Sequence, residues 1–205
     1  MHPSTDEAGF VANEASGLAG GISQDGCTAL SALVKASDVI LVRELIARIH
    51  AQPPDFFERL VIDVILAMGY GSNRAEMARC LGRSHDGGID GIIRLDELGF
   101  DSIFIQAKRL KPGVAVPISD VRDFAGSLEA RRATKGVLVT TTHFSAGAAD
   151  FCAQLSRKVV LIDGQRLAEL MLRFGIGVKV QHVFEIKALD RAYFSAPTFG
   201  TRRTG

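Results

Sequence analysis

The sequence predicts an α/β domain in which a mixed central sheet is flanked by helices on both faces. Helical and strand-like segments alternate along the chain, and this order places helices over a sheet. Residues 89–95 and 102–108 are separated by a polar turn and should pair as a hairpin, whereas the apolar run 159–162 is typical of a buried parallel strand. The 205 residues, 47% of them hydrophobic, are enough for one full core.

The N-terminal part of the chain predicts a lead segment followed by two helices. Residues 1–37 are rich in Gly, Ala and Ser, which favours a flexible segment. The domain should begin at residue 38 with a short amphipathic helix that ends before Pro53-Pro54. A second helix begins at Asp55 and ends at Gly69, a residue suited to a C-terminal cap. Its apolar stripe at helical spacing consists of Phe57, Leu60, Val61, Val64, Ile65 and Met68.

The C-terminal part continues the alternation of helices and strands after a polar loop at 72–88. Ser119 or Asp120 should cap one helix and Ser145 the next, because short polar side chains accept hydrogen bonds from the free amides of a helix start. The domain is expected to end at residue 194, before a loose tail at 195–205. The remaining elements are predicted at 119–132 (helix), 136–142 (strand), 145–155 (helix), 159–162 (strand), 165–174 (helix) and 178–186 (strand).

Composition restricts the setting in which the protein works. The formal net charge is only +1, so DNA binding would need basic residues gathered on one surface. The three cysteines, Cys27, Cys80 and Cys152, are widely spaced, which argues against a zinc site or a disulfide framework and favours a reducing cytoplasm. No apolar run reaches the roughly 18 residues that cross a bilayer, so no membrane partner is expected.

Three polar residues on the predicted hairpin form the most informative pattern in the chain: Asp90, Gln106 and Lys108. Side chains alternate between the faces of a strand, so Gln106 and Lys108 share one face. Asp90 joins them if it lies opposite Lys108, and equally if a shift of two residues places it opposite Gln106. A shift of one residue would separate the three groups, but burial of the apolar face opposes that shift.

These residue types suit the hydrolysis of a phosphodiester bond assisted by a divalent cation. Mg²⁺ prefers oxygen ligands, which the carboxylate of Asp90 and the amide of Gln106 can supply. The ammonium group of Lys108 can orient a water molecule or stabilise the charge that grows on the phosphate. The ordinary alternative is that the Asp-Gly pair forms a turn and that Lys108 is a solvated strand residue.

Glu58, Thr141 and several basic residues are further candidates for the site. Glu58 can join the metal ligands, but the segment from Asp55 to Glu58 also matches a capping box, which would explain the glutamate structurally. Thr141 ends a strand and can contact a DNA phosphate, although strand propensity explains it equally well. The basic candidates for a DNA-binding surface are Arg83, Arg109 and Lys111, for which a solvated face of mixed charge is the alternative.

Six short segments follow one another along the chain: Phe56–Val61, Met68–Tyr70, Asp86–Gly91, Gln106–Arg109, Gly136–Thr141 and Leu161–Gly164. In order and spacing they resemble the catalytic domain of Mrr-type restriction endonucleases, over roughly residues 38–194. The resemblance implies the restriction-endonuclease-like PD-(D/E)xK fold. It also implies hydrolysis of DNA with a divalent metal, Mg²⁺ or Mn²⁺, as in type IV restriction systems that attack modified DNA.

The resemblance also implies a role for each candidate residue. The metal-binding aspartate of the family falls on Asp90, and the first-helix glutamate falls on Glu58. A Gln-x-Lys variant of the usual acidic-x-Lys pair falls on Gln106 and Lys108. The resemblance therefore implies that Asp90, Gln106 and Glu58 hold the metal and that Lys108 completes the catalytic set.

The partners expected on this basis are double-stranded DNA and further protein chains. Relatives often carry a winged-helix DNA-reading domain ahead of the catalytic one, and residues 1–37 are too few for that module. Recognition of modified DNA is therefore expected to come from a separate partner protein or to be weak. Cutting both strands favours a homodimer. Two alternatives stay open: a catalytically inactive DNA-binding module of the same fold, and an α/β domain that binds a small ligand or a protein.

Overall fold

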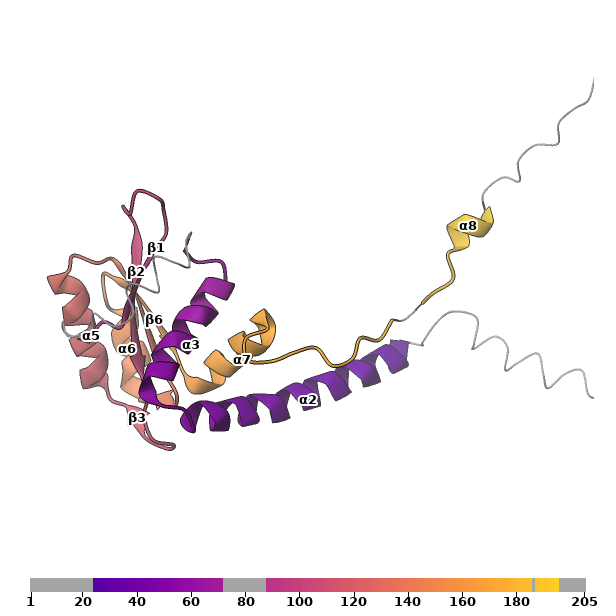
Figure 1. Ribbon diagram of the computed structural model, residues 1–205, viewed down its shortest axis with the longest axis horizontal. Coiled ribbons are helices and arrows are strands. Elements are labelled where there is room, and N and C mark those ends of the chain that lie inside the picture. The colour runs from indigo at the N-terminus through magenta and orange to yellow at the C-terminus, as the bar shows by residue number, and fades with distance from the viewer. Residues whose placement is uncertain (1–23, 72–87, 186, 196–205) are drawn as a thin grey trace, which may run out of the picture. The chain divides into compact units, whose positions relative to one another are not determined.

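A four-stranded sheet in the order β1-β2-β4-β6 forms the centre of the structure, a computed structural model (Figure 1). Strand β1 is antiparallel to β2, whereas β2, β4 and β6 run parallel to one another. The predicted hairpin, the predicted parallel strand and the mixed sheet are thereby confirmed. The strands are β1 (Gly91–Arg94), β2 (Ser102–Lys108), β4 (Lys135–Thr140) and β6 (Lys158–Ile162).

The structure describes residues 24–71, 88–185 and 187–195, which fall into two units. The unit that carries the sheet is Ser37–Lys179, and the other comprises Met1–Ala36 together with Val180–Gly205. The described helices are α2 (Gln24–His50), α3 (Pro54–Ala67), α5 (Ile118–Ala130), α6 (Ala146–Ala153), α7 (Gly164–Phe174) and α8 (Arg191–Ser195). No helix among these is long and apolar enough to span a membrane.

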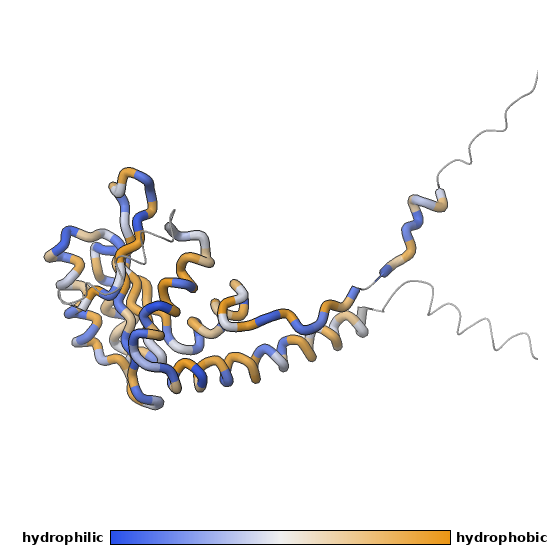
Figure 2. The backbone as a smooth tube through the Cα atoms, in the orientation of Figure 1, coloured by the Kyte–Doolittle hydropathy of each residue, from blue (hydrophilic) through white to orange (hydrophobic). Residues whose placement is uncertain are grey.

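Helices cover both faces of the sheet, as the fold prediction required. Figure 1 shows α3 and α7 on one side of the strands and α5 and α6 on the other. One apolar cluster joins α3, α7 and the end of α2 to Ile103 and Ile105 of β2, while a second joins α5 and α6 to Leu138 of β4. Figure 2 shows hydrophobic residues, coloured orange, along α3 and in the strands of the sheet. Because consecutive β2 side chains enter different clusters, the face of each β2 residue is fixed.

Helix α3 starts with prolines rather than with the capping box that the sequence suggested. Its N-cap is Pro53, no side chain caps it, and Pro54 takes the first helical position, where a missing amide costs nothing. The predicted C-terminal cap is confirmed, because Gly69 has φ +92° and its amide and that of Tyr70 bond to carbonyls of the last turn. The capping explanation for Glu58 is therefore wrong.

Several other element predictions also need correction. Helix α2 begins at Gln24, so part of the segment 1–37, predicted to be flexible, is helical. Leu33 and Val34 in this part of the helix are exposed, which explains why the sequence shows no apolar stripe there. The N-cap of α5 is Pro117, not Ser119 or Asp120. Strand β6, predicted to be buried, is an edge strand in which two of the five residues are exposed.

Two short segments also differ from their predicted form. The predicted strand at 178–186 does not form in its described residues, 178–185. A small parallel pair of strands, β3 (Ala115–Val116) and β5 (His143–Phe144), precedes α5 and α6 and had not been predicted. The predicted polar loop at 72–88 lies outside the described residues except for Gly88.

Candidate active site

The candidate site lies at the edge of the sheet where the parallel strands end. Strand β1 runs the opposite way and begins at this edge, so Asp90, which directly precedes β1, meets the carboxyl end of β2. Gly91 pairs with Ile105, and the amide of Asp90 donates to the carbonyl of Ile105 at 2.8 Å. Continuing this register places Asp90 opposite Gln106, the second of the two arrangements that keep the polar residues together.

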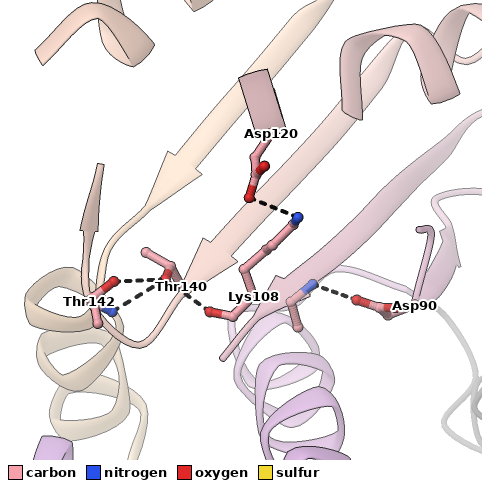
Figure 3. A network of polar contacts seen from close by, with 6 residues as sticks. Asp90, Lys108, Asp120, Thr140 and Thr142 are labelled. Atoms are coloured by element: carbon pink, nitrogen blue, oxygen red, sulfur yellow. Dashed lines mark hydrogen bonds and ion pairs between the residues drawn. The ribbon is translucent and has the colours of Figure 1, made fainter. Parts of the chain in front are cut away.

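The carboxylate of Asp90 is fixed against the backbone of β2. Its Oδ2 accepts a hydrogen bond from the amide of Ala107 at 2.7 Å, between Gln106 and Lys108 in the strand (Figure 3). The side chain is partly buried. This hydrogen bond fixes the orientation of the carboxylate beside the side chains of Gln106 and Lys108.

The amide of Gln106 supplies a buried oxygen that lacks a hydrogen-bond partner in the described part of the chain. Its Oε1 is shielded from solvent, and a buried acceptor without a partner costs free energy unless a ligand satisfies it. Gly88 packs against the same amide, since a Cβ built on Gly88 would lie 2.5 Å from Nε2 of Gln106. The backbone of Gly88 has φ +77°, a conformation that favours glycine.

Replacing Gly88 by alanine should therefore disturb the site directly. The new methyl group would push the Gln106 amide away, and the positive φ would lower the free energy of unfolding by about 1 kcal/mol. We expect slower cleavage at saturating metal together with a small loss of stability, measured by plasmid cleavage and by urea denaturation. Gly99, which also has a positive φ but lies in the β1–β2 turn, is the control: Gly99→Ala should lower stability without slowing cleavage.

Glu58 of α3 lies in the electrostatic field of Asp90. The pKa of Glu58 is raised above its usual value of 4.5, first by burial and then by the negative charges of Asp90 and Asp55. Two carboxylates that repel one another in a partly buried place are stabilised by a bound cation. The structure therefore brings Glu58 toward the Asp90 end of the site, although α3 packs on the face of the sheet opposite to α5.

The raised pKa of Glu58 gives a stability prediction. The charged form is disfavoured in the folded state, so its penalty is present when the carboxylate is ionised and disappears as the pH falls below about 4.5, the unfolded value. Glu58→Gln should raise the melting temperature by about 1–2 °C at pH 7 in EDTA and change it little at pH 4. It should also weaken the stabilisation that added Mg²⁺ gives the wild type. Thermal melts at both pH values check this, and destabilisation at pH 7 would contradict it.

Lys108 is held at both its backbone and its ammonium group. Its Nζ donates to Oδ2 of Asp120 at 2.8 Å, and its carbonyl accepts from the hydroxyl of Thr140 at 2.9 Å (Figure 3). Asp120 is a residue whose place in the site the sequence did not reveal. An acid in the first turn of a helix is explained equally well by the helix dipole, so nothing in the linear sequence separates the two roles.

The predicted DNA-binding residues have different environments. Thr141 has an exposed fraction of only 3%, and its hydroxyl bonds to both the amide and the carbonyl of Leu110, which is a structural role. Arg109 is exposed, and its guanidinium donates to the carbonyl of His50, the last residue of α2, at 2.6 Å. Lys111 is exposed. Arg83 lies outside the described residues.

The oxygen donors at this edge suit a hard divalent cation that takes only a few ligands from the protein. They are the carboxylate of Asp90 and the unsatisfied amide oxygen of Gln106, and the Glu58 carboxylate is close enough for its charge to repel that of Asp90. No group of three or more His, Cys, Asp or Glu side chains that could hold a metal occurs in the described residues. Magnesium usually keeps several waters and needs few protein ligands, which suits this set.

The sequence profile of a family described as restriction endonuclease, the Mrr catalytic domain, matches residues 49–171, more than half of the chain. The chain belongs to the Mrr-type restriction endonuclease family. The match includes all four predicted catalytic residues of this Mrr-type domain, and also Asp120. Family membership confirms the resemblance that the sequence motifs suggested.

Individual relatives agree with this assignment. The Mrr-type domain is 38% identical over 151 residues to the type IV methyl-directed restriction enzyme EcoKMrr of Escherichia coli K12, covering 74% of this chain and 48% of that enzyme. The chain thus spans about half the length of the curated relative that it matches.

Two solved structures resemble the Mrr-type domain. The restriction endonuclease MspJI in complex with a 27-mer oligonucleotide is 27% identical, with a TM-score of 0.49 over 67% of this chain and 31% of that one. The DNA modification-dependent restriction endonuclease AspBHI is 22% identical, with a TM-score of 0.51 over 69% of this chain and 36% of that one. The likeness to AspBHI supports the predicted restriction-endonuclease-like fold.

Proposed function

We propose that this chain is the catalytic domain of a divalent-metal-dependent endonuclease that hydrolyses phosphodiester bonds in modified double-stranded DNA. The observation that carries the proposal is the meeting of Asp90, Gln106 and Lys108 at one edge of the sheet in a chain of the Mrr-type family. The relative EcoKMrr is described as a methyl-directed restriction enzyme, which supports modified DNA as the substrate. As part of this proposal, the protein would act on cellular DNA in the cytoplasm.

Each residue has a role in this proposal. Glu58, Asp90 and Gln106 would hold Mg²⁺ or Mn²⁺ through their oxygens, and the Ala107 amide keeps the Asp90 carboxylate oriented. When bound, such a cation neutralises charge on the phosphate and lowers the pKa of a water molecule. Lys108 would orient the attacking water or stabilise the negative charge that develops on the phosphate.

Exposed basic residues beyond the end of β2 would contact the DNA backbone. Lys111 is exposed and makes no ion pair among the described residues, whereas Arg109 also holds the end of α2. Lys111→Ala should weaken DNA binding and reduce the dependence of log K on log salt by about one unit without changing stability. Arg109→Ala should weaken binding and also lower the free energy of unfolding by about 0.5–1 kcal/mol. Fluorescence anisotropy at several salt concentrations measures the DNA affinity of each variant, and urea denaturation measures its free energy of unfolding. Equal losses of stability in the two variants would contradict the additional structural role of Arg109.

The direct test is cleavage of methylated and unmethylated plasmids with Mg²⁺, Mn²⁺ or EDTA, scored for nicking and linearisation. The proposal predicts metal-dependent cutting that is faster on methylated plasmid. Binding without cutting under every metal condition would instead favour an inactive DNA-binding module. Cutting of both plasmids at equal rates would support nuclease activity but contradict a preference for modified DNA. We further propose that a separate protein partner strengthens the preference of this chain for modified DNA. We also propose that linearisation requires a homodimer, which a cooperative dependence of the cleavage rate on protein concentration would support.

A further inference from the structure

The ion pair between Lys108 and Asp120 joins the sheet to the start of α5. Asp120 lies in the first turn of α5, and its Oδ2 is 2.8 Å from Nζ of Lys108. The exposed fractions of the two side chains are 29% and 25%, so neither extends freely into solvent. The pair therefore differs from the mostly exposed pair of Arg48 and Glu44 on α2, whose side chains are 77% and 56% exposed.

The backbone of Lys108 is held on both sides. The Thr140 hydroxyl bonds to its carbonyl, and Thr140 also pairs with it across the parallel strands. Between Gln106 and Lys108, the amide of Ala107 is held by Asp90. The backbone is thus fixed next to the carboxylate, but the four-carbon side chain of a lysine retains many rotamers. Of the described contacts, the one that selects among these rotamers is the bond to Asp120.

We propose that Asp120 is a positioning residue that sets the orientation of the Lys108 ammonium group in the candidate active site. This inference rests on the proposed function, because it assigns Asp120 to the chemistry of that same site. Asp120 acts through Lys108. A misplaced catalytic group can cost about a hundredfold in rate, so the loss of the anchor should be visible in the cleavage step.

The charge of Asp120 allows a structural or electrostatic effect to be separated from positioning. Asp120→Asn removes a negative charge near the DNA, which by electrostatics alone strengthens binding to phosphates. A slower cleavage step with unchanged or tighter DNA binding therefore points to positioning. Asp123, exposed on the same helix, provides the matched control because Asp123→Asn makes the same change of charge.

The helix dipole is the other effect that must be separated. Asp120→Asn also removes an acid from the first turn of α5, which lowers helix stability. Ser119 is exposed in the same turn, so Ser119→Asp combined with Asp120→Asn returns the charge to the turn at a different position. This double variant should recover stability without recovering the rate, whereas Asp120→Glu should recover much of the rate.

The experiment measures single-turnover cleavage of methylated plasmid at saturating Mg²⁺, the KM for plasmid, and thermal melting for the wild type and these four variants. We expect Asp120→Asn to lower the cleavage rate at least about tenfold with KM unchanged or lower, while Asp123→Asn cuts at the wild-type rate. A wild-type rate in Asp120→Asn would overturn the inference, as would full recovery by the Ser119→Asp combination. Failure of the wild type and Asp123→Asn to cut would overturn the proposed function, and this inference with it.

Discussion

Asp90→Asn should abolish metal-dependent cleavage, with a loss of at least about 10³-fold in the single-turnover rate. The substitution is conservative in shape, and the amide oxygen of asparagine can still accept the hydrogen bond from Ala107 that orients Asp90. What disappears is the negative charge, which we propose is needed to hold the cation. The fold should therefore survive, and the pKa of Glu58 should move back toward its usual value because Asp90 no longer repels it.

The control for this variant is Glu97→Gln. Glu97 is exposed in the turn between β1 and β2, at the end of the hairpin far from Asp90, and its substitution removes the same charge. It should leave cleavage unchanged. Circular dichroism and thermal melting of both variants establish that they are folded. A folded Asp90→Asn protein that nicks DNA at the wild-type rate would show that Asp90 is not in the metal site.

Lys108→Met should lower the cleavage rate by about 10²–10³-fold while metal and DNA affinity change little. Methionine keeps an unbranched stem for packing but has no ammonium group to orient water or to stabilise charge. The variant leaves the Asp120 carboxylate without this partner; because the pair is part-exposed, the cost in unfolding free energy should be below about 1 kcal/mol. Rapid-quench cleavage assays and calorimetric titration with metal separate the two effects.

The control here is Lys135→Met, on the neighbouring strand β4. Lys135 begins β4, at the opposite edge of the sheet from the site, and pairs with Asp101. Its substitution removes the same charge but should leave the chemical step intact. If Lys108→Met lost DNA affinity in proportion to its rate, with the cleavage step unchanged at saturating DNA, Lys108 would be a phosphate-binding residue and its catalytic role would be wrong.

The central sheet and the face of the key residues could be predicted from the sequence because strand periodicity leaves few choices. The alternation around Ile103 and Ile105 fixed which side of β2 carries Gln106 and Lys108, and the structure confirms that Ile103 and Ile105 enter the core. The sequence could not choose between the two registers that both place Asp90 on that side. The observed pairing of Gly91 with Ile105 makes that choice.

The features of the site that could not be predicted from the sequence depend on how the chain packs in three dimensions. Asp120 and Lys108 are brought together by the packing of α5 on the sheet, which no local pattern encodes. The Thr141 hydroxyl had the properties of a phosphate contact, but packing buries it against Leu110. Glu58 had a satisfactory local explanation as a cap until Pro53 was found in that position.

Calorimetric titration of Mn²⁺ into the wild type and Asp90→Asn is the most direct test of the central claim that Glu58, Asp90 and Gln106 form one cation site. We expect one site per chain in the wild type, with an affinity at least about tenfold lower in Asp90→Asn and unchanged in Glu97→Gln. Equal affinity in the wild type and Asp90→Asn would contradict the claim.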